Sequence, residues 1–336
     1  MKNFIYLFIW AVPLCAAPID PVFIGQNYAT GVVKIILYDH GFVDDFNLSD
    51  DQGQLSRGSG FFVTPEGLIF TNRHVIEWCV KGYVVADWID NNGKEHKTDI
   101  LTYVNGMETD PSIKRIYYAG HTTPVVQVFR DHTQTSYDLY LAEVVAIGEN
   151  FDGAIVKVSA TLKGDPLSAH FNWLPLGNSD TVVLGEKLVI LGYPSQYTNS
   201  NLSMDLRDTL TLSQGADSGW DYIFDPDWGM IKTDAAIHEG NSGGPCFGTD
   251  NKVIGIATAL GIQTDIGLIG PVNIMYLLAK QDDSIFDSLS KKGLTKPRKE
   301  GHLEMVSGKP QKLPFDRKKY INPLTNQPVK DSLKTP

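Results

Sequence analysis

The sequence is short of cysteine, with three in 336 residues. Cys15 lies in an apolar N-terminal run, so Cys79 and Cys246 are the thiols left if that run is removed. Two thiols are too few for the disulfide framework on which many small secreted domains depend. We expect both to be buried thiols in a fold held together by packing, with a single Cys79–Cys246 bridge as the alternative.

Long hydrophobic runs are also missing. The N-terminal run, Phe4 to Leu14, is well short of the roughly 20 apolar residues that span a bilayer. Lys2 precedes this run and the small residues Cys15 to Ala17 follow it, which is typical of a secretory signal peptide, with a short membrane anchor as the alternative. We therefore expect residues 1–17 to be removed and the protein to be exported, periplasmic or extracellular, with no integral membrane segment.

Positive charge is scarce outside the C-terminal end. The net charge is −10, yet residues 291–336 contain twelve Lys or Arg against four Asp or Glu, which leaves −18 on the preceding part. An acidic body lacks the basic face that phosphate groups require, so we expect no nucleic-acid partner. Residues 286–336 form a basic, proline-containing tail with almost no apolar periodicity, and that composition predicts disorder.

Metal-ligand spacing is absent as well. The eight histidines do not pair with cysteine or with one another at the intervals of a zinc site. We predict no metal and no cofactor.

Helical periodicity is scarce, and short β segments dominate between residues 29 and 267, separated by Gly, Asn, Asp and Pro. That spacing favours an all-β barrel or sandwich. A single helical turn is expected around His74–Cys79, and a helix over 271–281 with Pro271 at its start. Residues 92–140 are polar with few strand signals, and we expect an insertion of loops with at most a hairpin.

The segment from Gly240 to Pro245 reads Gly-Asn-Ser-Gly-Gly-Pro and carries the clearest chemical signal. Its glycines permit a turn in which the N–H groups of Gly240 and Ser242 converge on one oxyanion. Ser242 is the candidate nucleophile. A serine alone is a weak nucleophile at neutral pH, so this interpretation requires a base and an orienting acid elsewhere.

Two upstream segments supply candidates for those roles. Apolar runs joined by a turn at Pro65–Gly67 would form a hairpin that delivers His74. Asp152 lies between two apolar runs, where it could reach the histidine ring. Taken alone, His74 could be a core histidine and Asp152 a turn residue, and Asp138 is the competing acid.

The local sequences resemble the HtrA/Deg branch of the trypsin-like serine proteases. The resemblance rests on the order His74, Asp152, Ser242 and covers roughly residues 28–281 apart from the insertion. Its motifs are Thr-Asn-Arg-His-Val at 71–75, Phe-Asp-Gly-Ala-Ile-Val-Lys-Val at 151–158, Leu-Pro-Leu-Gly-Asn-Ser-Asp at 174–180 with Gly-Tyr-Pro at 192–194, Lys-Thr-Asp-Ala-Ala-Ile-His-Glu-Gly-Asn-Ser-Gly-Gly-Pro at 232–245, and Val-Ile-Gly-Ile-Ala-Thr-Ala at 253–259.

The resemblance implies a chymotrypsin-like fold: a protease domain over 18–285 with two six-stranded antiparallel β-barrels, about 28–165 and about 166–270, and a C-terminal helix at 271–281. It implies that His74 is the general base, that Asp152 orients it, and that Gly240, Asn241 and Ser242 form the oxyanion hole. Asn241 replaces the aspartate of digestive trypsins, so we expect activity without cleavage to a defined N-terminus beyond signal removal. HtrA proteins generally carry PDZ domains, for which we expect no room here.

The resemblance also implies polypeptide substrates and places the specificity pocket at Ala236, Ile237, Ala259 and Leu260. These apolar residues predict cleavage after small or medium aliphatic residues. His238 nearby would favour an acidic residue if it faced the pocket. The oligomeric state stays open.

Two other functions fit parts of the sequence. The pattern Gly-x-Ser-x-Gly at 240–244 also occurs in α/β-hydrolase esterases, but those enzymes place the acid and the histidine after the serine. A non-catalytic peptide-binding or chaperone-like protein on the same fold is the other alternative.

Overall fold

The computed structural model of the chain describes residues 18–39, 54–77, 83–89, 95–100, 113–119, 122–134, 136–162, 170–194, 209–222, 227–260 and 266–299, together with residues 79, 92, 93, 167, 225 and 301. The predicted signal peptide, residues 1–17, and the tail beyond residue 301 lie outside the described residues.

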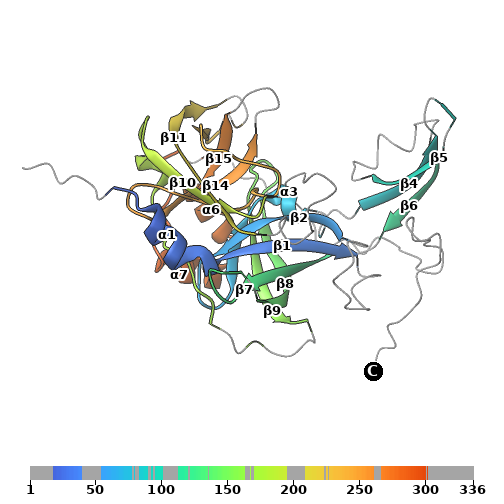
Figure 1. Cartoon of the computed structure of the whole chain (residues 1–336), viewed down its shortest axis with the longest axis horizontal. Coiled ribbons are helices and arrows are strands. Elements are labelled where there is room, and N and C mark those ends of the chain that lie inside the picture. Colours follow the sequence, from blue (N-terminus) through green and yellow to red (C-terminus); the bar gives the residue numbers. More distant parts are fainter. Residues whose placement is uncertain are drawn as a thin grey trace, which may run out of the picture.

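Two closed, six-stranded antiparallel barrels form the body of the molecule, as predicted (Figure 1). Around the first barrel the order is β1 (Val32–Asp39), β2 (Gln54–Phe62), β3 (Leu68–Thr71), β9 (Ala154–Thr161), β8 (Tyr137–Ile147) and β7 (Thr122–Phe129). Around the second it is β10 (Lys187–Gly192), β11 (Thr211–Asp221), β12 (Met230–Thr233), β15 (Gly267–Pro271), β14 (Val253–Leu260) and β13 (Pro245–Phe247).

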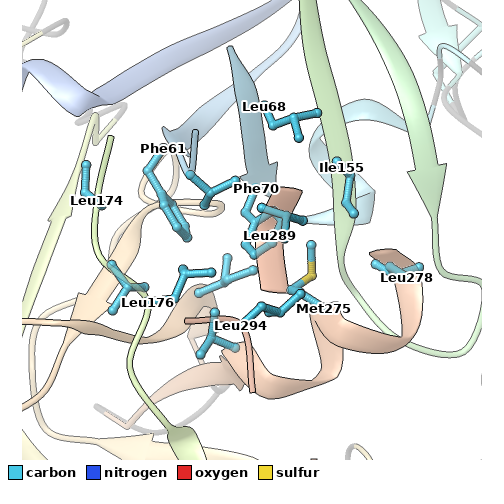
Figure 2. Close-up of a cluster of buried hydrophobic side chains, with 14 of the residues drawn as sticks. Phe61, Leu68, Phe70, Ile155, Leu174, Leu176, Met275, Leu278, Leu289 and Leu294 are labelled. Carbon is cyan, nitrogen blue, oxygen red and sulfur yellow. The ribbon is translucent and has the colours of Figure 1, made fainter. Parts of the chain in front are cut away.

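The strands are buried on alternating faces, as a barrel requires. Along β9, Ala154 and Val156 point into the cluster that fills the first barrel, whereas Ile155 between them joins a different cluster. That second cluster lies between the barrels and combines side chains of both with those of the C-terminal helices, including Met275 and Leu289 (Figure 2). The barrels are therefore held together by a shared apolar core.

Both thiols are buried and are not joined to each other, so the expectation of two buried thiols is confirmed. Cys79 packs in the cluster of the first barrel, and Cys246 in that of the second. Each thiol serves as a small apolar side chain.

The expected insertion at 92–140 is wrong in extent and in structure. The strands β4 (Tyr83–Ile89), β5 (Glu95–Ile100) and β6 (Ile113–Ala119) form a separate antiparallel sheet, which projects from the barrels in Figure 1. β7 then belongs to the first barrel. The sequence of β7 did not predict a strand, because it contains polar residues and Pro124. Pro124 pairs with Leu37 of β1 on one side only, because the pairing of β7 with β8 starts at Val125. A strand tolerates proline at such an edge position, where no partner strand requires its N–H.

The C-terminal helix differs from the one expected at 271–281. Pro271 is the last residue of β15, and the chain continues as a 3-10 turn, η4 (Val272–Ile274), and a short helix, α6 (Met275–Ala279). A further helix, α7 (Asp283–Ser290), follows and is capped by Asp282, whose carboxylate accepts two N–H groups.

The expected tail boundary at residue 286 thus falls inside a helix. Ile285 and Leu289, one turn apart on α7, are both buried, and this apolar pair outweighs the polar surroundings from which disorder was predicted. At the other end, helix α1 (Pro21–Tyr28), capped by Asp20, and the turn η1 (Ala29–Gly31) precede the first barrel. None of the helices in the described segments is long and apolar enough to cross a bilayer.

Candidate active site

A tight hairpin delivers His74. The turn after β2 closes with hydrogen bonds from Val63 N–H to the Leu68 carbonyl (2.8 Å) and from Gly67 N–H to the Thr64 carbonyl (3.2 Å). Gly67 has φ +93°, which favours glycine there. β3 then leads into the one-turn helix α3 (Arg73–Ile76), at the place where a helical turn was expected, and its buried Ile76 anchors it.

Asp152 lies in the turn between β8 and β9. Gly148 N–H donates to the Gly153 carbonyl (3.0 Å), and Gly153 N–H donates to the Phe151 carbonyl (2.8 Å). The Arg73 guanidinium donates to the Glu149 carbonyl and so connects this turn to α3.

Asp152 contacts His74 with both carboxylate oxygens. Oδ2 is 2.8 Å from His74 Nδ1, and Oδ1 accepts the His74 backbone N–H at 3.0 Å. The competing acid, Asp138, accepts instead from Arg130 Nε at 2.9 Å. The structure therefore brings together the histidine and the acid chosen from the sequence.

His74 and Asp152 shift each other's pKa in opposite directions, and the shift favours the ionised form of the Asp152 carboxylate. Burial lowers the pKa of His74, but the hydrogen bond and charge of Asp152, with a contribution from Glu77, raise it, and the net shift is upward. Burial raises the pKa of Asp152, yet the hydrogen bonds and charge of His74 lower it below its ordinary value. An ionised acceptor at Nδ1 keeps the proton there and leaves Nε2 as a base.

The turn that carries Ser242 is fixed by contacts with both barrels. Gly240 and Gly243 have φ +92° and +90°. Gly243 N–H donates to the Ala257 carbonyl (2.8 Å), and a Cβ at residue 243 would lie 1.9 Å from the Ser59 carbonyl oxygen. Ser59, on β2 of the first barrel, donates its N–H to the Ser242 carbonyl (2.7 Å) and its hydroxyl to the Gly240 carbonyl (2.7 Å).

Two backbone amides in this turn are available to a ligand. Asn241 N–H donates to the His238 carbonyl at 3.0 Å and is used within the turn. The N–H groups of Gly240 and Ser242 have no acceptor among the described residues. These are the two donors predicted for the oxyanion site, which stays a prediction, and Asn241 lies between them in the turn.

The Ser242 hydroxyl donates to the Thr258 carbonyl at 2.8 Å, and among the described residues it makes no hydrogen bond with His74. The two halves of the site are nonetheless connected. Asn72 Nδ2 donates to the Asp152 carbonyl (2.8 Å) and to Thr258 Oγ1 (3.0 Å). The three predicted residues are thus linked through Asn72 and Thr258 in one hydrogen-bonded network, in which the serine hydroxyl is bonded to Thr258 and not to the base.

Sequence reasoning missed Ser59, Asn72 and Thr258 as parts of this network. A signal was present, because Asn72 and Ser59 are polar residues next to apolar runs, and both are fully buried. Buried polar side chains need partners, which marks such positions as candidates. The described residues include no group of three or more His, Cys, Asp or Glu side chains that could hold a metal ion.

The expected specificity residues on either side of Ile237 differ from it in burial. Ala236 and His238 are exposed, whereas Ile237 between them is 1% exposed and packs in the core of the second barrel. Ile237 differs from its neighbours because alternate side chains of an extended segment point to opposite sides, and the pocket at these positions stays a prediction. Ala259 and Leu260 end β14, directly after Thr258.

Three comparisons with known proteins show what the chain is similar to. The family model described as trypsin-like peptidase domain matches residues 58–256. A probable periplasmic serine endoprotease DegP-like of Chlamydia pneumoniae is 27% identical over 215 residues, 64% of this chain and 30% of that relative. A putative serine protease HhoA of Synechocystis is 34% identical over 223 residues, 65% of this chain and 40% of that relative.

The chain therefore matches less than half the length of these relatives. A solved structure of the HtrA-type protease AlgW with tripeptide matches 80% of this chain and 64% of its own at 18% identity, with a TM-score of 0.49. The family match covers more than half of the 336 residues and includes His74, Asp152 and Ser242, and the chain belongs to the trypsin-like peptidase family.

Proposed function

We propose that the protein is a serine endopeptidase that works through Ser242, His74 and Asp152. The observation that carries this proposal is the contact of Asp152 with both the ring and the backbone N–H of His74. Such an arrangement fixes the ring and its tautomer, as the base of an acyl-transfer reaction requires.

The reaction starts with a rotation of the serine side chain. The Ser242 hydroxyl leaves the Thr258 carbonyl and turns toward His74 Nε2, a change of staggered rotamer about one bond. His74 accepts the hydroxyl proton while Oγ attacks the substrate carbonyl, and Asp152 stabilises the resulting imidazolium.

The amides of Gly240 and Ser242 then bind the oxyanion. Each such donor is worth about 3 kcal/mol in the transition state. His74 returns its proton to the leaving amine, the C–N bond breaks, and the acyl group stays on Oγ. A water molecule, deprotonated by His74, attacks this ester, and Ser242 regains its proton as the acid product leaves.

The proposed substrates are polypeptides, cut after small or medium aliphatic residues by an exported enzyme. The exposed Ala236 next to the serine turn supports the apolar preference, because it offers no carboxylate to bind Arg or Lys. The periplasmic description of the Chlamydia relative supports export.

A fluorophosphonate probe tests the proposal, because it reacts with an activated serine and requires no knowledge of the substrate. We expect labelling at Ser242, located by mass spectrometry, and its loss in Ser242→Ala and His74→Ala. Asp138→Asn is the matched control, since this carboxylate pairs with Arg130 instead of His74, and it should label as wild type does. Cleavage of casein but not of a short-chain ester would separate a protease from an esterase.

A non-catalytic peptide-binding protein is the second candidate. The hydrogen bond of the Ser242 hydroxyl to the Thr258 carbonyl favours it, since a serine held there is not activated. Absence of labelling, together with measurable binding of a peptide library, would support this function over the first.

A further inference from the structure

The chain beyond α7 turns back onto the protein. Gly293 has φ +95°, and Leu294 N–H donates to the Leu289 carbonyl at 3.2 Å, which closes the helix with a left-handed glycine cap. The turn brings Leu294 into the core between the barrels (Figure 2). We name residues 291–299 together with Gly301 the C-terminal strap.

A carboxylate on the second half of the molecule clamps this strap. Asp180 Oδ2 accepts the Arg298 backbone N–H at 2.6 Å, and the Asp180 carbonyl accepts from Arg298 Nη2 at 3.2 Å. The same Oδ2 accepts from Asn273 Nδ2 at 3.0 Å, and Asn273 is 1% exposed. The buried Asn273 therefore holds the Asp180 carboxylate in position, and that carboxylate in turn holds the strap at Arg298.

The strap ends against a buried tryptophan. A Cβ placed on Gly301 would lie 2.6 Å from Trp228 Cε2 and 2.8 Å from its Nε1. Trp228 is 5% exposed, and its backbone N–H donates to the Asp225 carboxylate at 2.9 Å. Gly301 therefore covers the indole closely enough that any side chain there would displace one of the two.

Trp228 in turn packs on the residue before Asp152. The Trp228 and Phe151 rings meet edge to face, with centroids 6.0 Å apart. Phe151 is 2% exposed, and its ring lies directly against Gly153 in the same turn, since a Cβ on Gly153 would lie 2.4 Å from the ring. A displaced indole would therefore press on Phe151, the residue next to Asp152.

We propose that the C-terminal strap is a positioning element for Asp152, acting through Trp228 and Phe151. The proposal rests on the function proposed for the triad. The strap contacts Asp180 and Trp228, and its Lys292 and Lys299 lie over the rings of Trp173 and Tyr222. Among the described residues, no hydrogen bond joins it to His74 or Ser242, so we expect it to affect the chemical step and not substrate binding. A misplacement of about 1 Å at a reacting group can cost on the order of a hundredfold in rate.

Gly301→Ala tests the proposal, with Gly25→Ala as its matched control. Neither glycine has a positive φ, and a Cβ on Gly25 meets only Leu212 Cδ1, at 3.9 Å. We expect G301A to lower kcat about tenfold at unchanged KM, and G25A to leave both constants as in wild type. Trp228→Phe removes indole atoms that the new methyl group meets, so the double variant should recover part of the lost kcat.

A second readout requires no turnover. In a Ser242→Ala background, NMR titration of the His74 ring reports its contact with Asp152. We expect G301A to move the His74 midpoint downward, because a displaced carboxylate stabilises the imidazolium less, and G25A to leave it in place. If G301A does not fold, Arg298→Ala, which removes one of the two contacts with Asp180, should shift the midpoint in the same direction by less.

An unchanged His74 midpoint in both strap variants overturns the proposal, as does a loss of kcat that the Trp228→Phe substitution leaves unrelieved. If wild type is neither labelled by the fluorophosphonate probe nor active, the proposed function fails instead. The titration still decides whether the strap positions Asp152.

Discussion

The two halves of the candidate site are held in different ways. The Ser242 turn is fixed by backbone hydrogen bonds, by positive-φ glycines and by Ser59 from the other barrel. The pair of His74 and Asp152 is held by side-chain hydrogen bonds and charge, and 42% of the His74 side chain is exposed. The nucleophile therefore depends on steric fit, whereas the base depends on electrostatics.

This difference separates the effects of mutation. Damage to the turn should act at every pH and should also destabilise the fold, because the turn is part of the contact between the barrels. Damage to the pair should alter the pH dependence and leave the fold largely intact. Each prediction below tests one side of this contrast.

The largest effect is expected for Gly243→Ala. The new methyl group would lie 1.9 Å from the Ser59 carbonyl oxygen, in a backbone conformation with φ +90° that side chains resist. We expect loss of measurable activity and a fall in the free energy of unfolding of at least about 3 kcal/mol. Urea denaturation measures this free energy. Gly93→Ala is the control, since φ is +80° there and no described atom would lie within 4 Å of the new Cβ. Equal losses in the two variants would contradict the steric account.

Asp152→Asn should nearly abolish activity without unfolding the protein. An amide in place of the carboxylate allows the wrong tautomer and removes the charge that stabilises the imidazolium. We expect kcat to fall roughly 10⁴-fold, as for other triads, with a circular dichroism spectrum like that of wild type. A loss smaller than about tenfold would show that Asp152 does not orient the base.

The sequence predicted the parts of the site that depend on local patterns. The glycine turn around Ser242 and the hairpin before His74 follow from alternation and turn residues within short segments. The same pattern favoured a barrel or sandwich, and the two six-stranded barrels followed from the family resemblance. The segment that carries Ser59 is 181 residues away from Gly240, and no pattern within either segment indicates that they meet. The order of residues 286–299 was mispredicted for the same reason, since only packing with distant segments determines it.

Asn72→Ala tests how the two halves communicate. Asn72 Nδ2 joins the Asp152 carbonyl to Thr258 Oγ1, and Thr258 in turn accepts the Ser242 hydroxyl. We expect kcat to fall about tenfold to a hundredfold at an unchanged KM, because the serine turn and the pair of His74 and Asp152 are no longer held at a fixed distance from each other. Thr258→Val removes one of the two contacts and keeps the carbonyl, so its loss should be smaller. A larger loss in T258V than in N72A would place the connection elsewhere.

The smallest effect is expected on the pH dependence of stability. The folded pKa of His74 is raised, so its contribution is complete below the ordinary imidazole value, about 6.5, and is lost as pH rises through the folded value. The folded pKa of Asp152 is lowered, so its contribution is complete above about 3.9 and is lost as pH falls through the folded value. The difference in unfolding free energy between wild type and D152N should therefore be greatest between about pH 4 and 6.5 and should shrink on either side. Because the pKa of His74 is raised, the kcat/KM of wild type should increase with pH and reach half of its maximum above about pH 6.5, since only neutral His74 accepts the serine proton. A stability difference that is constant across this range would mean that the pair is held by shape, as the serine turn is, and not by charge.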